Sequence, residues 1–177
     1  MANYRRNFVP GGTYFFTVVT ANRQPIFHNE LARTLLGLSM RECFQRRTTK
    51  VLAMVLLPQH LHAIWELPPG DSDYSVRWQV IKAMFTNHWN AANNQNQKPQ
   101  HSLWQRRFWE HTVKDEEDLE AHFDYIHYNP VKHQLVSSPK DWPWSTFHRW
   151  VECGHYHADW GAGYIDQSLP GGAGEFI

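Results

Sequence analysis

Cysteine and long apolar stretches are scarce in this sequence of 177 residues, and both absences exclude classes of protein. The two cysteines, Cys43 and Cys153, are too few for a disulfide-stabilised secreted domain and do not form a C-x-x-C metal or redox pair. No window approaches the roughly 18 apolar residues of a membrane-spanning helix, and no apolar segment of the signal-peptide kind follows the first arginines. We therefore expect a cytoplasmic protein that does not enter a membrane.

An excess of charge is also missing, because 17 basic residues balance 17 acidic ones. The chain thus lacks the overall positive field of proteins that coat duplex DNA, so any contact with nucleic acid must be local. Aromatic residues, in contrast, make up 15% of the chain and include nine tryptophans. They are typical either of a plain core or of surfaces on which unpaired bases stack. The length suits one domain, which we place at residues 1–150, followed by an irregular tail at 151–177.

Hydrophobic periodicity and turn residues predict the order β-α-β-β-α-β-α. The strands are expected at 13–21, 50–57, 60–67 and 108–113, and the helices at 29–46, 74–92 and 115–129. Leu31, Leu35 and Leu38, together with Phe44, are expected to form the apolar side of the first helix. Asn29 is expected to cap that helix, and Pro130 is expected to end the third one.

This order is typical of an α+β fold of the ferredoxin-like βαββαβ kind, with one added C-terminal helix that carries candidate catalytic residues. In this fold helices cover one face of an antiparallel sheet, and the other face is left for a ligand. The first and third strands are central, so the strand at 60–67 should lie near the middle of the sheet.

A pair of histidines begins this third strand, within LLPQHLHAIWELP at residues 56–68. His60 and His62 are two positions apart, so a strand projects both side chains from the same face. Such a pair is a candidate metal site. Because the chain contains twelve histidines, a chance pair that is exposed or merely hydrogen-bonded is the alternative.

The third helix offers further ligands beside its apolar stripe. His122, Tyr125 and Asn129 follow the spacing i, i+3, i+7 and share one helical face. The Asn129 amide oxygen could complete a His-His-oxygen site, with the Tyr125 phenol next to the metal as a nucleophile toward phosphorus. His122 or His127 could relay the phenol proton. The alternatives are a packing role for Tyr125 and a helix-ending role for Asn129.

Four ordered motifs resemble a known family. These motifs are LPQHLH (57–62), WQRRFWEH (104–111), YIHYNPVKH (125–133) and DWPWSTFH (141–148). They resemble the REP-associated tyrosine transposases, a branch of the IS200-like single-tyrosine HUH transposases, and the resemblance extends from Tyr4 to about Trp150. It implies a ferredoxin-like fold and a metal-dependent nuclease and strand transferase that acts on single-stranded DNA, often beside a hairpin.

The resemblance also implies residue roles. His60, His62 and Asn129 would hold Mg²⁺ or Mn²⁺, and Tyr125 would form a covalent 5′-phosphotyrosine. Gln134 departs from the pattern, since many members have glycine there, which leaves open a different turn after the third helix.

Local basic and aromatic groups are the expected DNA contacts. The candidates are Tyr4, Arg5, Arg6, Arg77, Lys82, Arg106 and Arg107. A monomer is favoured over a homodimer, because the long segment after the third helix could cover a dimer surface. Two other functions stay open: a non-catalytic module that binds hairpin DNA, and a phosphodiesterase in which water replaces Tyr125 as the nucleophile.

Overall fold

Four antiparallel strands form the centre of the structure, a computed structural model that describes residues 6–93 and 102–163. The strands are β1 (Thr13–Val19), β2 (Lys50–Leu56), β3 (His60–Glu66) and β4 (Trp109–Thr112). Their spatial order is β2-β3-β1-β4, and each neighbouring pair is antiparallel. The first and third strands are therefore central, as predicted, and β3 brings its histidines to the middle of the sheet.

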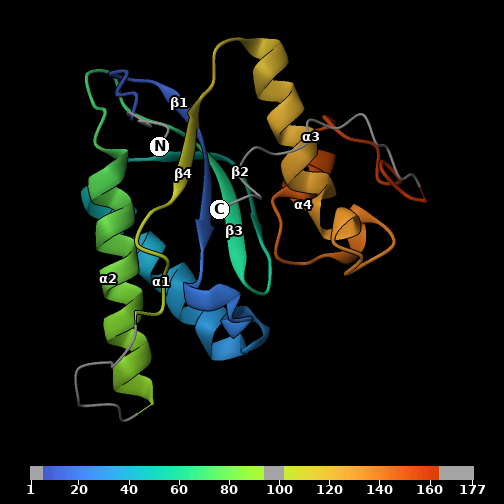
Figure 1. Cartoon of the computed structure of the whole chain (residues 1–177). Helices are drawn as coiled ribbons and strands as arrows, with labels where there is room; N and C mark the ends of the chain where they lie inside the picture. Colours follow the sequence, from blue (N-terminus) through green and yellow to red (C-terminus); the bar gives the residue numbers. More distant parts are fainter. Residues whose placement is uncertain (1–5, 94–101, 164–177) are drawn as a thin grey trace, which may run out of the picture.

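Helices lie on both sides of this sheet (Figure 1). Helices α1 (Glu30–Arg46) and α2 (Tyr74–Ala92) cover one face, and α3 (Glu116–Lys132) lies on the other together with α4 (Phe147–Glu152). The α+β class and the predicted element order are confirmed, whereas α4 was not predicted. The face that the topology leaves for a ligand is thus partly covered by α3. No helix in the described part of the chain is long and apolar enough to cross a membrane.

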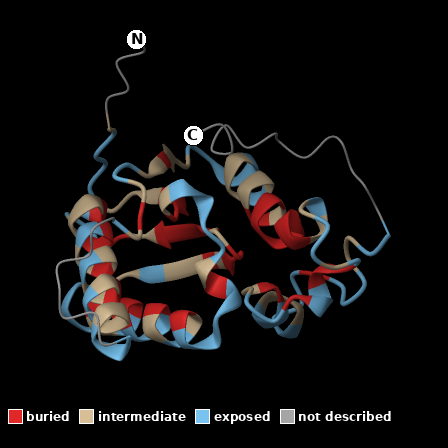
Figure 2. Cartoon of the chain, turned by 60° about the horizontal axis from the view of Figure 1, so that its bottom comes forward, coloured by how far each residue is buried: buried red, intermediate tan, exposed pale blue. Residues whose placement is uncertain are grey.

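Strand β1 contributes to two hydrophobic cores because its side chains alternate between the faces. Tyr14 and Phe16 belong to the core shared with α1 and α2, and Phe15 belongs to the core shared with α3. Figure 2 shows the resulting pattern, with buried residues in the sheet and on the helix sides that face it. Side chains between β3 and α3 therefore lie in the interior of the protein.

Helix α1 begins as predicted but uses a different apolar side. The Asn29 side chain accepts a hydrogen bond from the Ala32 amide at 3.3 Å. Leu31 and Leu38, however, are 41% and 37% exposed. The buried side carries Ala32, Leu36, Met40 and Cys43 instead. The prediction was wrong for Leu31 and Leu38, whereas Leu35 and Phe44 do pack against the core. Contact with α2 and the sheet selects the i, i+4 row that begins with the small Ala32.

Helix α3 continues through Pro130 to Lys132, which corrects the predicted end at residue 129. Pro130 removes one backbone donor, but the turn after it is closed by other bonds. The Leu135 amide donates to the Pro130 carbonyl at 2.9 Å, and the Gln134 amide donates to the Val131 carbonyl at 2.8 Å. This pair of bonds is a Schellman motif, and Gln134 has the left-handed φ of 57° that the motif requires. The turn keeps the conformation that glycine favours although glycine is absent.

The chain after α3 closes the free edge of β2. The Leu56 amide donates to the Trp144 carbonyl, and the Thr146 amide donates to the Met54 carbonyl, each at 2.9 Å. The Trp142 indole donates to the Leu56 carbonyl at 3.0 Å. An exposed strand edge invites pairing with other chains, so this segment protects β2.

Replacing Gln134 with glycine is expected to raise the free energy of unfolding by about 1 kcal/mol, because it removes the Cβ that penalises a left-handed conformation. Urea unfolding of the two proteins measures the difference. Gln134→Ala is the matched control, because alanine keeps the Cβ and should leave the stability nearly unchanged. An equal effect of glycine and alanine would mean that backbone conformation at residue 134 is not the cause.

Candidate active site

His60 and His62 lie together on the face of the sheet that α3 covers. Leu61 and Ala63, which alternate with them along β3, pack into the core on the opposite face. The two imidazole centroids are 4.8 Å apart. His60 is 2% exposed and His62 is fully buried. The alternative of an exposed chance pair is therefore excluded.

A threonine on the neighbouring strand orients His62. Thr17 is opposite His62 in the register of β1 and β3, and its Oγ1 lies 2.9 Å from His62 Nδ1. With the ring proton on Nδ1, the lone pair is on Nε2, which has no hydrogen-bond partner among the described residues. Burial lowers the pKa of His62 well below 6.5, and the nearby His60, His133 and Lys132 lower it further. His62 is therefore a neutral imidazole that can act as a ligand.

Helix α3 places Tyr125 against His62 and carries Asn129 one helical turn later. Tyr125 is 2% exposed, and its ring centroid is 5.1 Å from that of His62. Asn129 is fully buried, and neither Oδ1 nor Nδ2 of its amide has a hydrogen-bond partner in the described ranges. Leaving a buried amide without such a partner costs about 1–3 kcal/mol. The fold therefore keeps a polar group in the core where a ligand would satisfy it.

Sequence reasoning missed two more residues, Lys132 and His133, because it ended the helix before them. The His133 ring centroid is 5.3 Å from that of His60. The Lys132 ammonium lies 4.9 Å from the centroid of the Tyr125 ring. Both residues belong to the motif YIHYNPVKH, and a helix that continued through Pro130 would have brought them to this face.

The donor atoms that His60, His62 and Asn129 offer fit a divalent cation, and His62 Nε2 and Asn129 Oδ1 have no hydrogen-bond partner among the described residues. Two imidazoles and an amide oxygen form a mixed nitrogen and oxygen donor set that suits Mn²⁺. The same set suits Mg²⁺ when further oxygen ligands complete its coordination. The neutral state of His62 agrees with this use, since only a neutral imidazole has a lone pair to offer.

His127 anchors α3 from the side opposite to Tyr125 and Asn129. Its Nε2 lies 2.8 Å from Thr146 Oγ1, and its Nδ1 lies 3.2 Å from the Tyr156 hydroxyl. That hydroxyl donates to Asp124 Oδ1 at 2.8 Å. Burial, with smaller contributions from His155 and Arg149, lowers the pKa of His127 to about 3. These partners make His127 an anchor rather than a proton relay for Tyr125.

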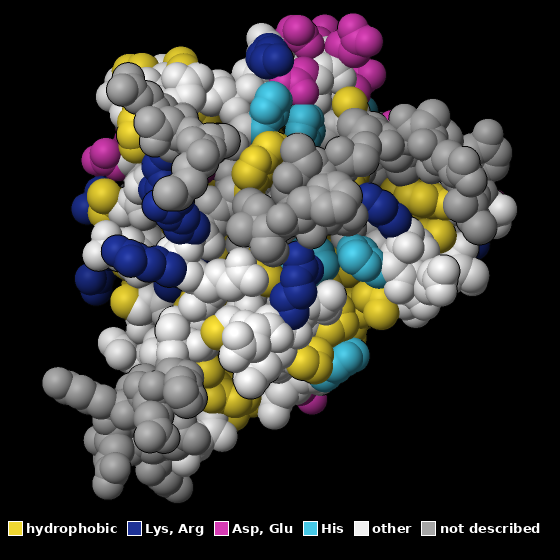
Figure 3. All heavy atoms as spheres, viewed as in Figure 1, with side chains coloured by type: hydrophobic (Ala, Val, Ile, Leu, Met, Phe, Trp, Pro, Cys, Tyr) yellow, Lys and Arg dark blue, Asp and Glu magenta, His cyan; other side chains and the backbone are white. Residues whose placement is uncertain are grey.

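A second feature, which we call the basic pocket, lies between α2 and the segment before β4. This cavity of about 710 Å³ is lined by several of the predicted DNA-contacting residues, namely Arg6, Lys82 and Arg106, together with Trp78, Trp104 and Phe108. The Arg6 guanidinium lies 4.3 Å from the centroid of Phe108, and Lys82 Nζ lies 5.5 Å from it. Burial, with the nearby charge of Arg6, lowers the pKa of Lys82 to about 8. Figure 3 shows basic side chains gathered over α2.

The remaining candidates have different positions. Arg107 is exposed beside the basic pocket without lining it, and Tyr4 and Arg5 lie outside the described residues. Arg77 corrects the sequence prediction, because it is 1% exposed and forms an ion pair with Asp71 at 2.6 Å. Its guanidinium also donates to Thr49 Oγ1 and to the Thr48 carbonyl. Arg77 therefore holds the start of α2 to the loop before β2 and is not placed to contact DNA.

Comparison with known proteins identifies the family. The model of a family described as "Transposase IS200 like" matches residues 9–129, which contain both the histidine pair and Tyr125. The chain belongs to the IS200-like transposase family. It is therefore an enzyme of the single-tyrosine transposase class, whose members cleave DNA and transfer strands. This result confirms the resemblance drawn from the four motifs.

Relatives of this IS200-like transposase match along nearly its whole length. The REP-associated tyrosine transposase of Escherichia coli (strain K12) is 42% identical over 180 residues, which cover 100% of this chain and 99% of that protein. A Haemophilus influenzae relative, assigned to the same kind of transposase, is 40% identical over 91% of this chain and 94% of its own. A solved structure of a REP-associated tyrosine transposase bound to a REP hairpin superposes with a TM-score of 0.81, at 40% identity and 96% coverage of both chains.

In this IS200-like transposase, Arg77→Ala is expected to lower the free energy of unfolding by about 2–3 kcal/mol, because Asp71 loses its buried partner. The hydrogen bond from Arg77 lowers the pKa of Asp71 below 3.8. A lowered carboxyl pKa adds stability that is present above the unfolded-state pKa and is lost as the pH falls through the folded-state value. The difference from wild type should thus be constant at neutral pH and shrink below about pH 4.

Urea unfolding across this pH range measures the effect, with the exposed Arg46→Ala as the matched control. Normal stability combined with weakened DNA binding in Arg77→Ala would contradict the structural role.

Proposed function

We propose that this chain cleaves and rejoins single-stranded DNA beside a hairpin, with Tyr125 as the nucleophile. The observation that supports this most directly is the buried contact of His60, His62 and Tyr125, with the fully buried Asn129 one helical turn after Tyr125 on α3. His62 Nε2 and the Asn129 amide are buried without hydrogen-bond partners among the described residues, which costs stability that packing alone does not explain. Together the four residues supply a nucleophile and a cation-binding donor set.

The proposed substrate is a REP-like hairpin with adjoining single-stranded DNA. The support is the solved relative bound to a REP hairpin, which matches 96% of this chain with a TM-score of 0.81. The chain itself has no net charge, so its DNA contacts must come from local basic groups.

His60, His62 and Asn129 are proposed to hold Mg²⁺ or Mn²⁺. When bound, such an ion draws electron density from the phosphate and makes its phosphorus easier to attack. The chain's own contribution is to fix the donors in advance: Thr17 orients the His62 ring, and the anchor at His127 holds the helix that carries Asn129.

Tyr125 is proposed to attack the scissile phosphorus through its phenolic oxygen. As the new phosphorus–oxygen bond forms, the phenol loses its proton and the bond to the 3′ oxygen breaks. The 3′ oxygen leaves with the electron pair and takes up a proton, which gives a free 3′-OH and a 5′-phosphotyrosine. Lys132 supports this step, because its ammonium places positive charge 4.9 Å from the Tyr125 ring centroid. Attack by another 3′-OH would reverse the step and join strands without ATP.

The basic pocket is proposed to hold part of the DNA. Arg6, Lys82 and Arg106 line it beside aromatic rings, an arrangement that suits a phosphate next to a stacked base. Arg107, Tyr4 and Arg5 remain proposed DNA contacts. We also propose a monomer, since the chain's own segment around Trp144 already covers the β2 edge.

Tyr125→Phe is expected to abolish a denaturant-resistant protein–DNA adduct, because phenylalanine lacks the attacking oxygen. The assay uses an end-labelled single-stranded hairpin from the repeats that flank the gene, with Mn²⁺, Mg²⁺ or chelator. Adduct formation should fall by at least about 10³-fold in the variant, and the adduct of the wild type should vanish in chelator. Tyr128→Phe, on the same helix, is the matched control and should retain the adduct.

The outcomes separate the alternatives. Cleavage that persists in Tyr125→Phe would instead identify water as the nucleophile. Metal-independent binding without cleavage, across several hairpins, would support a non-catalytic binding module.

Replacing Arg6, Lys82 and Arg106 one at a time with glutamine is expected to weaken hairpin binding and to reduce the slope of log K against log salt by up to about one per residue, because each change removes a phosphate contact. Fluorescence anisotropy at several salt concentrations measures this slope. Arg46→Gln, an exposed arginine that does not line the basic pocket, is the control. Slopes equal to that of wild type would remove the basic pocket from the DNA-binding surface.

A further inference from the structure

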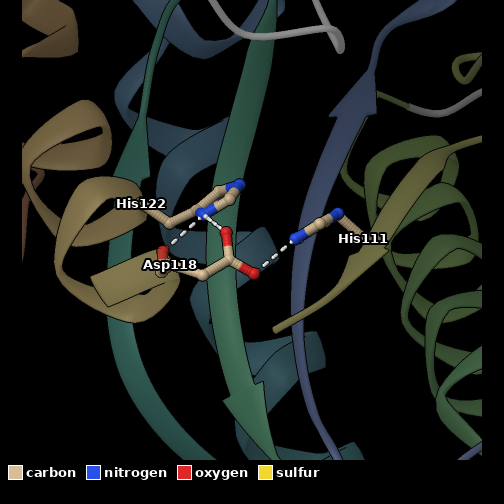
Figure 4. A group of neighbouring side chains, drawn as sticks. All are labelled: His111, Asp118 and His122. Atoms are coloured by element: carbon tan, nitrogen blue, oxygen red, sulfur yellow. Dashed lines mark hydrogen bonds and ion pairs between the residues drawn. The ribbon is translucent and has the colours of Figure 1, made fainter. Parts of the chain in front are cut away.

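A second group of potential metal ligands lies at the junction of β4 and α3 (Figure 4). His111 comes from β4, and Asp118 and His122 come from the first turns of α3. His111 Nε2 lies 2.7 Å from Asp118 Oδ2, and His122 Nδ1 lies 3.1 Å from Asp118 Oδ1. No local pattern in the sequence joins these residues, because 11 positions separate His111 from His122 and only the β4–α3 turn brings them together.

The spacing of the three side chains suits a transition metal. Each offers one ligand atom, and the three atoms lie within 4.8 Å of one another. Ligands of a tetrahedral zinc ion lie about 2.0–2.2 Å from the metal, so neighbouring ligand atoms are separated by about 3.3 Å. His122 Nδ1 also lies 2.7 Å from the Asp118 carbonyl, so a bound ion requires the ring to release this contact or to turn its Nε2 toward the ion.

The protonation states also suit a metal. Burial lowers the pKa of His122, which keeps its imidazole neutral at physiological pH. Burial alone would raise the pKa of Asp118, but hydrogen bonds from His111 and from the Lys114 amide outweigh it, and the net pKa is lowered. Asp118 is therefore a carboxylate. In the present arrangement a proton lies between His111 Nε2 and this carboxylate, and a bound cation would replace it.

Access and local charge favour a cation here. The three side chains are 24%, 20% and 16% exposed, so they are partly buried but open to solvent on one side. Glu116 and Glu117 in the same helical turn are exposed and add negative charge. Figure 3 shows histidine side chains directly beside acidic ones where α3 begins.

This group shares no residue with the site around His60 and His62. Phe15 is the common neighbour, since its ring centroid is 5.4 Å from that of His62 and 4.7 Å from that of His122. The two groups can thus be occupied independently, and nothing in the second one depends on the proposed DNA chemistry.

We propose that His111, Asp118 and His122 form a separate binding site for a zinc-class divalent ion. Two imidazoles and one carboxylate favour Zn²⁺ over Mg²⁺, and solvent can supply the remaining ligands on the open side. A bound ion joins β4 to α3 one helical turn before Tyr125. It therefore fixes the helix segment that carries the proposed nucleophile.

The test is a Zn²⁺ titration of the full-length protein by calorimetry, beside His111→Gln/His122→Gln. The double variant should bind one Zn²⁺ fewer than wild type. At a free Zn²⁺ concentration of about 100 times Kd, the midpoint of thermal unfolding of the wild type should rise by roughly 5–10 °C. The double variant should lose most of this increase. His28→Gln/His157→Gln replaces two exposed histidines and is the control, which should keep both properties.

Equal Zn²⁺ stoichiometry in wild type and His111→Gln/His122→Gln would overturn the proposal. Because that variant could lose stability without metal, a second measurement uses the wild-type protein alone. Crystals grown with Zn²⁺ should show an anomalous scattering peak at the zinc edge between His111, Asp118 and His122. If zinc were bound elsewhere in the crystal and this peak were absent, the proposed site would also be disproved.

Discussion

The packing of α3 against the open face of the sheet is the contact on which the candidate active site depends. Phe123 and Ile126 of α3 bury apolar surface against Phe15 and Ile64, which supplies a favourable free energy of about 25 cal/mol per Å². The same contact turns Tyr125 toward His62. A helix that packed with a different side against the sheet would keep every residue of the motif and lose the site.

Polar anchors fix which side of α3 faces the sheet. His127 is hydrogen-bonded to Thr146 and Tyr156, two residues that follow α3 in the chain. The segment around Trp144 and Thr146 also covers the edge of β2. The residues after the proposed nucleophile are therefore part of the catalytic domain's structure. Tyr156 is 7% exposed, so this support extends beyond the expected boundary at residue 150.

The buried polar groups of the candidate active site oppose stability. His62 and Asn129 are fully buried with polar atoms that lack partners in the part of the chain described. Such groups cost free energy in the absence of a ligand, and the two surrounding hydrophobic cores offset that cost. Arg77 shows the opposite case, because its buried charge is fully engaged by Asp71, Thr48 and Thr49 and therefore serves the fold.

Local patterns in the sequence determined the strands, the three long helices, and the common faces of His60 with His62 and of Tyr125 with Asn129. Periodicities of 2 and 3.6 residues are properties of the chain itself, so they can be read without a structure. The resemblance in four motifs added the family, which comparison with known proteins confirmed.

Only the tertiary structure decided the rest, because each remaining feature depends on contacts between distant segments. Contact with α2 chose Ala32 rather than Leu31 for the core. Helix α3 continued past Pro130 and ended only at the Schellman turn, which left Lys132 beside Tyr125. Arg77 was misassigned because a surface arginine and a buried, paired one look alike in sequence. Burial and partners are set by which segments meet, and no local pattern encodes them.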